Sequence, residues 1–166
     1  SDNVAVGAGA LDANTTGTSN NAFGRHALGG CVDGSYNVAM GANALKANTS
    51  ASYNTGLGHG AATAITTGSG NTAVGCNSLV TCVTGTNNTA VGQGALFTST
   101  ASENTAIGTK ALYSCTTGSQ NLAAGYWSLY GLTTGSGNTA LGGNWCGSNI
   151  TTGDQNTAVG ENSLKS

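Results

Sequence analysis

The sequence predicts an all-β fold, a parallel β-solenoid of ten coils with about 17 residues each. The first observation is a short motif, Asn-Thr-Ala-Val-Gly in its commonest form, which recurs ten times at intervals of 16 to 18 residues. The second is composition, because charged residues make up only 6% and the chain has 28 glycines and no proline. Aliphatic residues keep the same phase in all ten copies, which a disordered linker has no reason to do. Residues 1–166 are therefore expected to form a single repeat domain.

Positions in each coil are counted from the last residue of the motif, the repeat glycine. Four residues before it, every copy has an asparagine. Stacked coils would place these side chains in a ladder, each amide bonding the coil above or below. An asparagine that only sets the corner through its own turn is the alternative. The ten asparagines are Asn3, Asn20, Asn37, Asn54, Asn71, Asn88, Asn104, Asn121, Asn138 and Asn156.

The residues around the repeat glycine predict two strands in each coil. One residue before the glycine is a large aliphatic in most copies, as at Val74, and two before it is never larger than alanine, as at Ala73. A second segment has Ala or Ser three residues after the glycine, with Trp145 as the exception, and then Leu, replaced at Ala62 and Cys146. A β-branched residue and a Thr-Gly turn complete the coil. We expect two strands of about five residues each.

Apolar residues on both faces of the first strand predict a homo-oligomer. Near-continuous apolar strands are usually buried on both faces, whereas one coil has only one interior. A surface of small side chains suits the close approach of identical chains. The candidate contact residues are therefore the alanines two before the glycine, of which the central ones are Ala73, Ala90, Ala106, Ala123 and Ala140.

The pattern Asn-Thr-Ala-Val-Gly-x-x-Ala-Leu, closed by Thr-Thr-Gly-Ser, resembles the head repeats of trimeric autotransporter adhesins. It is more similar still to repeat tracts in the tail fibres of phages and algal viruses. The resemblance covers essentially the whole chain. It implies a left-handed parallel β-roll, three chains packed side by side as a homotrimer, and attachment to surfaces. Adhesin heads have coils shorter than 17 residues, and this chain has no recognisable stalk, anchor or chaperone segment.

Charge and motif content argue against several classes of function. The net charge is −2 and the basic residues form no stripe, so no nucleic-acid partner is expected. The sequence has no apolar run of spanning length, so no membrane insertion is expected. Six carboxylates and two histidines lie scattered, without a catalytic pair or metal-ligand spacing. We therefore expect no enzyme activity, no metal and no cofactor.

Five cysteines raise the question of disulfides. Cys31, Cys82 and Cys115 share the position seven residues after the glycine, in coils two or more apart. Their α-carbons would be at least about 9.6 Å apart in a stack of strands, beyond disulfide reach within a chain. Cys76 and Cys146 lie elsewhere. Partly buried free thiols are the main expectation, and disulfides between chains are the alternative.

The aromatic residues Tyr126, Trp127, Tyr130 and Trp145 cluster in an otherwise aromatic-poor chain. Aromatic rings on a Thr, Ser and Asn surface can stack on sugars or on a protein partner. They are the candidate surface-binding residues, for a host glycan or receptor. The alternative is that they fill a widened corner or cover a seam between subunits.

These features together predict a structural and adhesive fibre module, a rigid rod outside a cell or virion. The alternative is a solenoid that binds ice or another crystal surface, which the rows of threonine suggest. Such solenoids need threonine at alternate positions on one flat face, whereas the Thr-Thr pairs near the closing turn send neighbouring side chains to opposite faces. The first and last repeats could also complete one another, so head-to-tail stacking into filaments is a further expectation.

Overall fold

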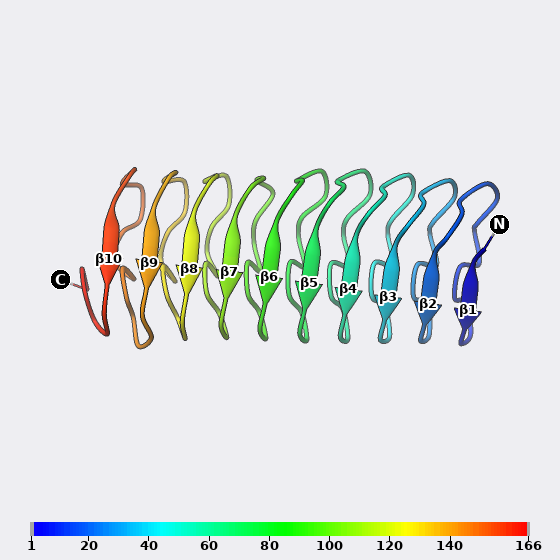
Figure 1. Cartoon of the computed structure of the whole chain (residues 1–166), viewed down its shortest axis with the longest axis horizontal. Helices are drawn as coiled ribbons and strands as arrows, with labels where there is room; N and C mark the ends of the chain where they lie inside the picture. The colour runs from blue at the N-terminus through cyan, green and yellow to red at the C-terminus, as the bar shows by residue number, and fades with distance from the viewer. Residues whose placement is uncertain (1, 166) are drawn as a thin grey trace.

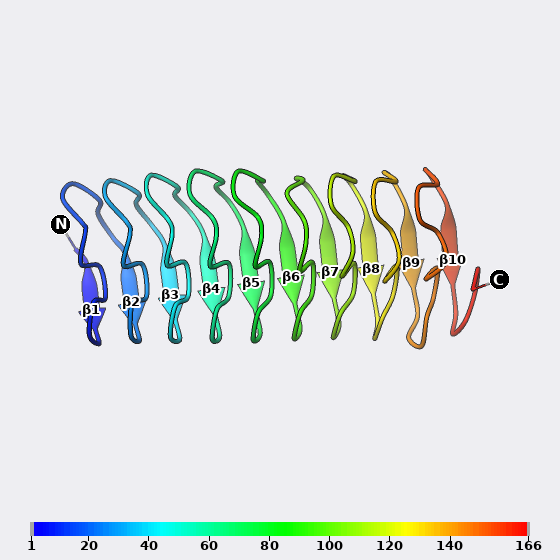
Figure 2. The ribbon, with the colours of Figure 1, turned by 180° about the vertical axis from the view of Figure 1, so that it is seen from behind.

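The computed structural model describes residues 2–165 as one parallel β-solenoid (Figures 1 and 2). Each coil contributes one three-residue strand, and the ten strands form a single sheet in chain order along the rod. Neighbouring strands are parallel, and equivalent residues of successive coils are paired. The strands are β1 Val4–Val6, β2 Asn21–Phe23, β3 Val38–Met40, β4 Thr55–Leu57, β5 Thr72–Val74, β6 Thr89–Val91, β7 Thr105–Ile107, β8 Leu122–Ala124, β9 Thr139–Leu141 and β10 Thr157–Val159.

The predicted solenoid of about 17 residues a turn is therefore confirmed, whereas the prediction of a second strand in each coil was wrong. The second segment is a run of turns, because its residues alternate in the sign of φ. Asn77 and Leu79 have φ of +53° and +51°, which no strand allows. The Leu79 N–H still donates to Ala95 O of the following coil at 3.0 Å, and the Asn77 N–H donates to His59 O of the preceding coil at 2.9 Å. The coils are thus hydrogen-bonded on both sides of the rod.

The repeat glycine ends each strand in a backbone conformation that only glycine tolerates easily. At Gly75 φ is +125°, and a Cβ there would lie 2.7 Å from the carbonyl carbon of Gly92 in the next coil. Every coil stacks its glycine on the next in this way as far as Gly142. The invariant glycine therefore follows from the close approach of successive coils.

The interior is narrow and filled by stacked columns of side chains. Leucines from the second segment, such as Leu79 and Leu96, extend across it to the alanines of the sheet. Cys82, Cys115 and Ile65, each seven residues after a repeat glycine, lie beside them and are fully buried, as are Leu79 and Leu96. At Gly56, the only glycine in the alanine column, an added Cβ would already lie 3.1 Å from Leu45 Cγ. The space therefore holds alanine and nothing larger.

The asparagine column forms a buried ladder along one side of this interior. Asn71 Oδ1 accepts the backbone N–H of Asn88 at 3.0 Å and its side-chain amide at 3.1 Å. Asn71 Nδ2 donates to Asn54 Oδ1 at 3.1 Å and to Gly85 O at 2.9 Å. Each asparagine thus joins the coil before it to the coil after it and closes the turn that precedes the next strand.

The single 18-residue coil has its extra residue at Gly143, directly after a repeat glycine. Leu129 N–H donates to Cys146 O at 2.9 Å, the bond that other leucines make to the Ala or Ser position of the next coil. Cys146 therefore takes that position and Gly147 takes the leucine position. Trp145, which was expected in the Ala or Ser column, instead lies at the equivalent of the second residue after the glycine, on the outside. The left-handed winding that the resemblance implies stays a prediction.

Candidate functional site

The sheet face that points away from the interior is apolar. The residues one before each repeat glycine lie on it, and several are well exposed, with 52% of Met40, 46% of Ile107 and 67% of Val159 accessible. The residues three before the glycine share this face and are mostly threonines, such as Thr72 and Thr89. A strip of mostly threonine and aliphatic side chains therefore runs along the rod, with threonine in six of the ten strands. We call it the sheet face.

The alanines expected at a contact between chains point the other way. Ala73, Ala90, Ala106, Ala123 and Ala140 are all fully buried in the interior of their own chain. Placing them at an interface was wrong, because the sequence pattern shows that successive side chains alternate but not which set faces inward. The residues available to another chain are those of the sheet face.

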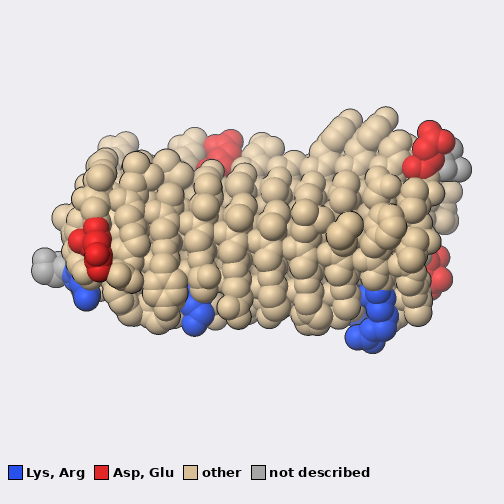
Figure 3. Space-filling view, turned by 60° about the horizontal axis from the view of Figure 1, so that its bottom comes forward, with Lys and Arg blue, Asp and Glu red and all other residues tan. Residues whose placement is uncertain are grey.

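The surface on one side of the sheet consists of the first, second and fifth residues after each repeat glycine. We call it the basic edge, because Arg25, Lys46, Lys110 and Lys165 all lie on it. These positions are neighbours in space, since the rings of Tyr126 and Trp127 stack at 5.4 Å and those of Trp127 and Tyr130 at 4.7 Å. Figure 3 shows the Lys and Arg side chains along a single margin of the rod.

The four predicted aromatic residues meet on the basic edge. The indole rings of Trp127 and Trp145 lie edge to face, with centroids 4.1 Å apart and an angle of 77°. Lys110 Nζ lies 5.2 Å from the centre of the Trp127 ring and Lys165 Nζ lies 6.0 Å from that of Trp145. We call these rings, with those of Tyr126 and Tyr130, the aromatic cluster. It is a protruding, partly exposed surface with two ammonium groups against it.

Two further rings extend the cluster and were not predicted. Phe97 stacks on Tyr113 at 5.0 Å, and Tyr113 stacks on Tyr130 at 5.3 Å, with nearly parallel planes. All three are the fifth residue after a repeat glycine, so the repeat spacing could have identified them. Because these rings stack on one another along the rod, their faces are largely occupied. Rings stacked in this way have little free face left for stacking on a sugar ring.

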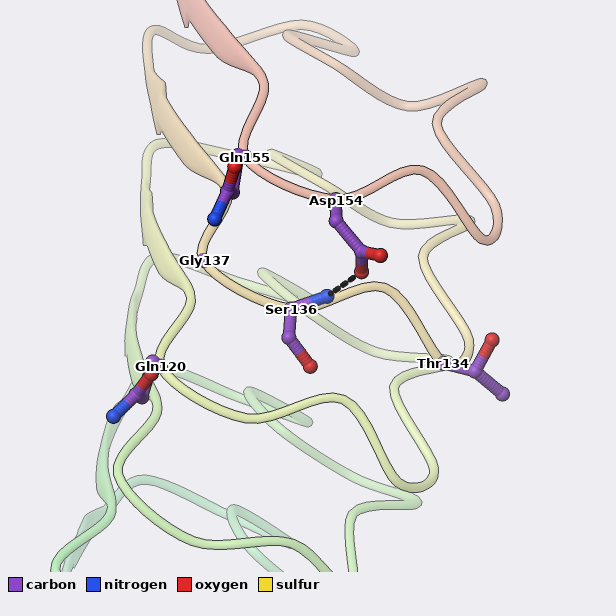
Figure 4. Close-up of a pocket in the computed structure, with 6 residues that line it drawn as sticks. All are labelled: Gln120, Thr134, Ser136, Gly137, Asp154 and Gln155. Carbon is purple, nitrogen blue, oxygen red and sulfur yellow. Dashed lines mark hydrogen bonds between the residues drawn. The ribbon is translucent and has the colours of Figure 1, made fainter.

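The opposite side of the sheet carries a polar groove of about 480 Å³. It is lined by Gln120, Gly137 and Gln155, each the fifth residue before a repeat glycine, and by Thr134, Ser136 and Asp154. Figure 4 shows Gly137 between the two glutamine side chains, where the missing side chain leaves the gap. Asp154 Oδ1 accepts the N–H of Ser136 at 2.7 Å. Nothing in the sequence indicated this groove, because it depends on residues from three successive coils.

We call this second surface the acidic edge. It comprises the fifth and sixth residues before each repeat glycine and the ninth residue after the preceding one. It carries four of the six carboxylates, those of Asp2, Asp33, Glu103 and Asp154. Glu103 Oε2 accepts a hydrogen bond from Gln120 Nε2 at 2.9 Å. The stacked rings of Tyr36 and Tyr53, 5.1 Å apart, also lie here.

The five cysteines are free thiols, and Cys31, Cys82, Cys115 and Cys146 are buried. Burial raises the pKa of the Cys115 thiol to about 11, against a smaller lowering by its hydrogen bond to Gly118 O. Desolvation likewise raises the pKa of Cys31 and of Cys82. Such thiols are poor nucleophiles, because the thiolate is the reactive form. Cys76 is the exposed exception.

Among the described residues, no group of three or more His, Cys, Asp or Glu side chains is placed to hold a metal ion. Within residues 2–165 there is also no helix with the length and apolar character needed to cross a membrane. Comparisons with protein-family models, with curated proteins and with solved structures each find no match to this chain.

Proposed function

We propose that this chain is a rod module of an extracellular fibre, in which copies pack side by side as a homotrimer through the sheet face. The observation that carries the proposal is the column of mostly aliphatic side chains, each exposed or partly exposed, along the outer face of the parallel sheet. Parallel sheets are normally covered on both faces, and large exposed apolar patches mark contact sites. The interior of the coil covers one face, so a second chain is the natural cover for the other.

The internal construction of the coils supports a spacing role. Hydrogen bonds join each coil to the next through the strand, the second segment and the asparagine ladder. Repeats that contact only their neighbours can be added or removed with nearly additive effects on stability. A rod of this kind sets a distance and presents its surface over a long span. Attachment to a glycan or receptor on a host surface belongs to the proposal on the strength of the sequence resemblance.

The test is the sedimentation behaviour of the purified chain. Val74→Asp with Val91→Asp places two carboxylates in the middle of the sheet face. We expect the wild type to sediment as a trimer and this variant as a folded monomer, since a buried unpaired charge is strongly unfavourable. Thr100→Asp with Thr116→Asp, on exposed threonines away from the sheet, is the control for added charge and should remain trimeric. A monomeric wild type at high concentration would refute the proposal.

Binding to ice or to another crystal surface is the second candidate, and one observation favours it. Threonines such as Thr72 share the outer face of the sheet with aliphatic residues such as Val74. The Thr-Thr pairs near the closing turn, which argued against a regular threonine face, lie outside this sheet. The same face cannot bind a crystal and a partner chain at once, so the oligomeric state separates the two functions. A monomeric wild type with measurable thermal hysteresis, lost in the Val74→Asp and Val91→Asp variant, would favour the crystal surface.

A further inference from the structure

The charges of this chain are separated between the two edges that flank the sheet. All four Lys and Arg residues lie on the basic edge, whereas four of the six carboxylates lie on the acidic edge. The two exceptions are Asp12 and Glu161, which lie on the basic edge. The edges are far enough apart in one coil, with the strand between them, that these opposite charges do not pair within the chain.

Opposite charges also lie at matching heights along most of the rod, the exception being β1, which Asp2 and Asp12 flank. Glu103 precedes β7 and Lys110 follows it, so the two flank the same strand on opposite edges. Asp154 and Lys165 flank β10 in the same way. Asp33 lies between β2 and β3, which places it level with the coils of Arg25 and Lys46. A neighbouring copy at the same height would therefore bring one of these three acids close to each of the four bases, with Asp33 shared by Arg25 and Lys46.

Bulky and small side chains are matched between the edges as well. The aromatic cluster lies on the basic edge at the height of β8 and β9, and the groove at Gly137 lies on the acidic edge directly before β9. Nearer the N-terminal end, the large side chain lies on the acidic edge and the small residue lies on the basic edge. Tyr53 lies on the acidic edge before β4, and Gly60 lies on the basic edge after β4. The aromatic cluster and Tyr53 thus each have a small residue or a groove at their own height on the other edge.

We propose that copies of this chain pack in parallel without axial shift, the basic edge of one against the acidic edge of the next, with the aromatic cluster in the neighbour's groove at Gly137. This rests on the proposed side-by-side assembly and adds how the copies meet. Rotation about an axis parallel to the rod keeps every residue at its height, so this contact between two different surfaces closes into a ring. The sheet faces then line the axis, and the charged edges form the seams.

The division of roles follows from the strengths of the contacts. The apolar sheet face provides most of the association, because burial of apolar area is the main driving force. Exposed ion pairs add little affinity, but like charges brought together by a wrong register are unfavourable, so the edges select the register. Trp and Tyr that enter a partner's pocket commonly dominate an interface. The groove is also a polar site for the indole N–H and phenol O–H groups, through the carbonyl oxygens of Gln120 and Gln155.

The first experiment uses the fact that both tryptophans of the chain lie in the aromatic cluster. Intrinsic fluorescence therefore reports on the cluster alone. We expect the emission of the assembled wild type to be blue-shifted, and several-fold less quenched by iodide, than that of the monomeric Val74→Asp and Val91→Asp variant. Gly137→Gln fills the groove with the residue found at the same position in the adjacent coils, where Gln120 and Gln155 have φ of +60° and +56°. It should remove the protection and weaken assembly about tenfold. Gly70→Gln, at the same position away from the cluster, is the matched control.

The second experiment reverses charges. Glu103→Lys and Lys110→Glu should each weaken assembly several-fold at low ionic strength, where exposed charges interact most strongly. The double variant should recover wild-type assembly, because each seam then has the pair in reversed order. Glu103→Lys with Lys46→Glu combines two heights and should not recover. Recovery by this mismatched pair, or none by the matched pair, would overturn the register.

The outcomes separate this inference from the proposed function. An oligomeric wild type whose tryptophans are as accessible as in the monomeric variant, and whose assembly tolerates Gly137→Gln as well as Gly70→Gln, overturns the edge contact and leaves the sheet-face assembly standing. A monomeric wild type overturns both. Tryptophan protection, loss at Gly137 and rescue by the matched charge pair together would establish the contact.

Discussion

The buried columns and the two edges belong to the same coils, yet they differ in how strictly they repeat. The repeat glycine and the ladder asparagine are present in all ten copies, and the inward alanine is replaced only once, by Gly56. On the acidic edge, one column passes through Tyr36, Glu103, Gln120 and glycines. An interior side chain contacts its own equivalent in the next coil, so a change there disturbs the stacking. An edge side chain is free to vary, and its variation distinguishes one height of the rod from another.

Breaking the interior at its tightest point should have the largest effect. Gly75→Ala places a Cβ 2.7 Å from the carbonyl carbon of Gly92 at φ of +125°. The unfavourable φ and the overlap together should lower the free energy of unfolding by about 3 kcal/mol or more. Gly143→Ala is the control, because the nearest atom to its added Cβ is Tyr126 N at 4.0 Å. Urea denaturation of both variants measures the difference, and equal stabilities would contradict the close stacking.

The asparagine ladder should come next. Asn71→Ala removes the acceptor for the Asn88 N–H at 3.0 Å and the donor to Gly85 O at 2.9 Å, all inside the rod. Buried groups left without partners cost about 1–3 kcal/mol, and we expect about 2–3 kcal/mol here. The control is Asn87→Ser, which changes the exposed residue directly before the next ladder asparagine, Asn88, at a position where Ser19 adopts φ of +57°. A loss as large for Asn87→Ser as for Asn71→Ala, in the same denaturation assay, would mean that the ladder is not the source of the stability.

The two faces of one strand provide a third comparison. Ala73→Leu overpacks the interior against the leucine column and should lower the free energy of unfolding by about 1–3 kcal/mol. Val74→Ser changes the neighbouring residue, whose side chain points outward. It should leave the free energy of unfolding of the monomeric chain nearly unchanged but weaken assembly. Thermal unfolding and sedimentation of the two variants measure both quantities. A variant of Ala73 that stays fully stable but fails to assemble would reverse the assignment of the two faces.

The assignment of the inner and outer faces of the strand also shows what the sequence alone could not predict. The repeat length, the parallel stacking and the columns follow from the phase of Asn, Ala, Val and Gly. Alternation places Ala73 and Val74 on opposite faces but does not say which face is inside. The answer depends on the space left by the leucines, as the 3.1 Å approach to Leu45 at Gly56 shows. The second segment was taken for a strand because its Ala-Leu pattern looks apolar, whereas the positive φ of Leu79 is set by the winding of the coil.

The candidate site was predictable only in part, for a related reason. Tyr126, Trp127, Tyr130 and Trp145 stand out by composition, and the repeat spacing would have added Phe97 and Tyr113. The position of Trp145 on the outside could be recognised only from the hydrogen bond that Leu129 N–H donates to Cys146 O. This bond identifies Gly143 as the inserted residue. The groove at Gly137 depends on three successive coils at one height. Features within a column can be found from the sequence, and features between columns need the structure.

The smallest predicted effect concerns the buried thiols and depends on pH. Cys115 has a pKa of about 11 in the folded chain because burial disfavours the thiolate, whereas the ordinary value is 9.0. Below about pH 9 both states keep the proton and the group contributes no pH dependence. As the pH rises further, the unfolded chain loses its proton first, so stability falls until the folded thiol ionises near pH 11. One unit of pH above 9 corresponds to a loss on the order of 1 kcal/mol.

Cys115→Ser should therefore flatten the decrease in the free energy of unfolding between pH 8 and about pH 10. Serine is accommodated at the equivalent position of the preceding coil, where Ser99 is buried. The comparison of variant with wild type at each pH isolates the contribution of Cys115, because every other residue is the same in both. Cys76→Ser, at the exposed thiol, is the control for replacing a cysteine outside the interior. A slope that is the same in Cys115→Ser as in the wild type, with reductant present throughout, would mean that the interior does not hold this thiol in its neutral form.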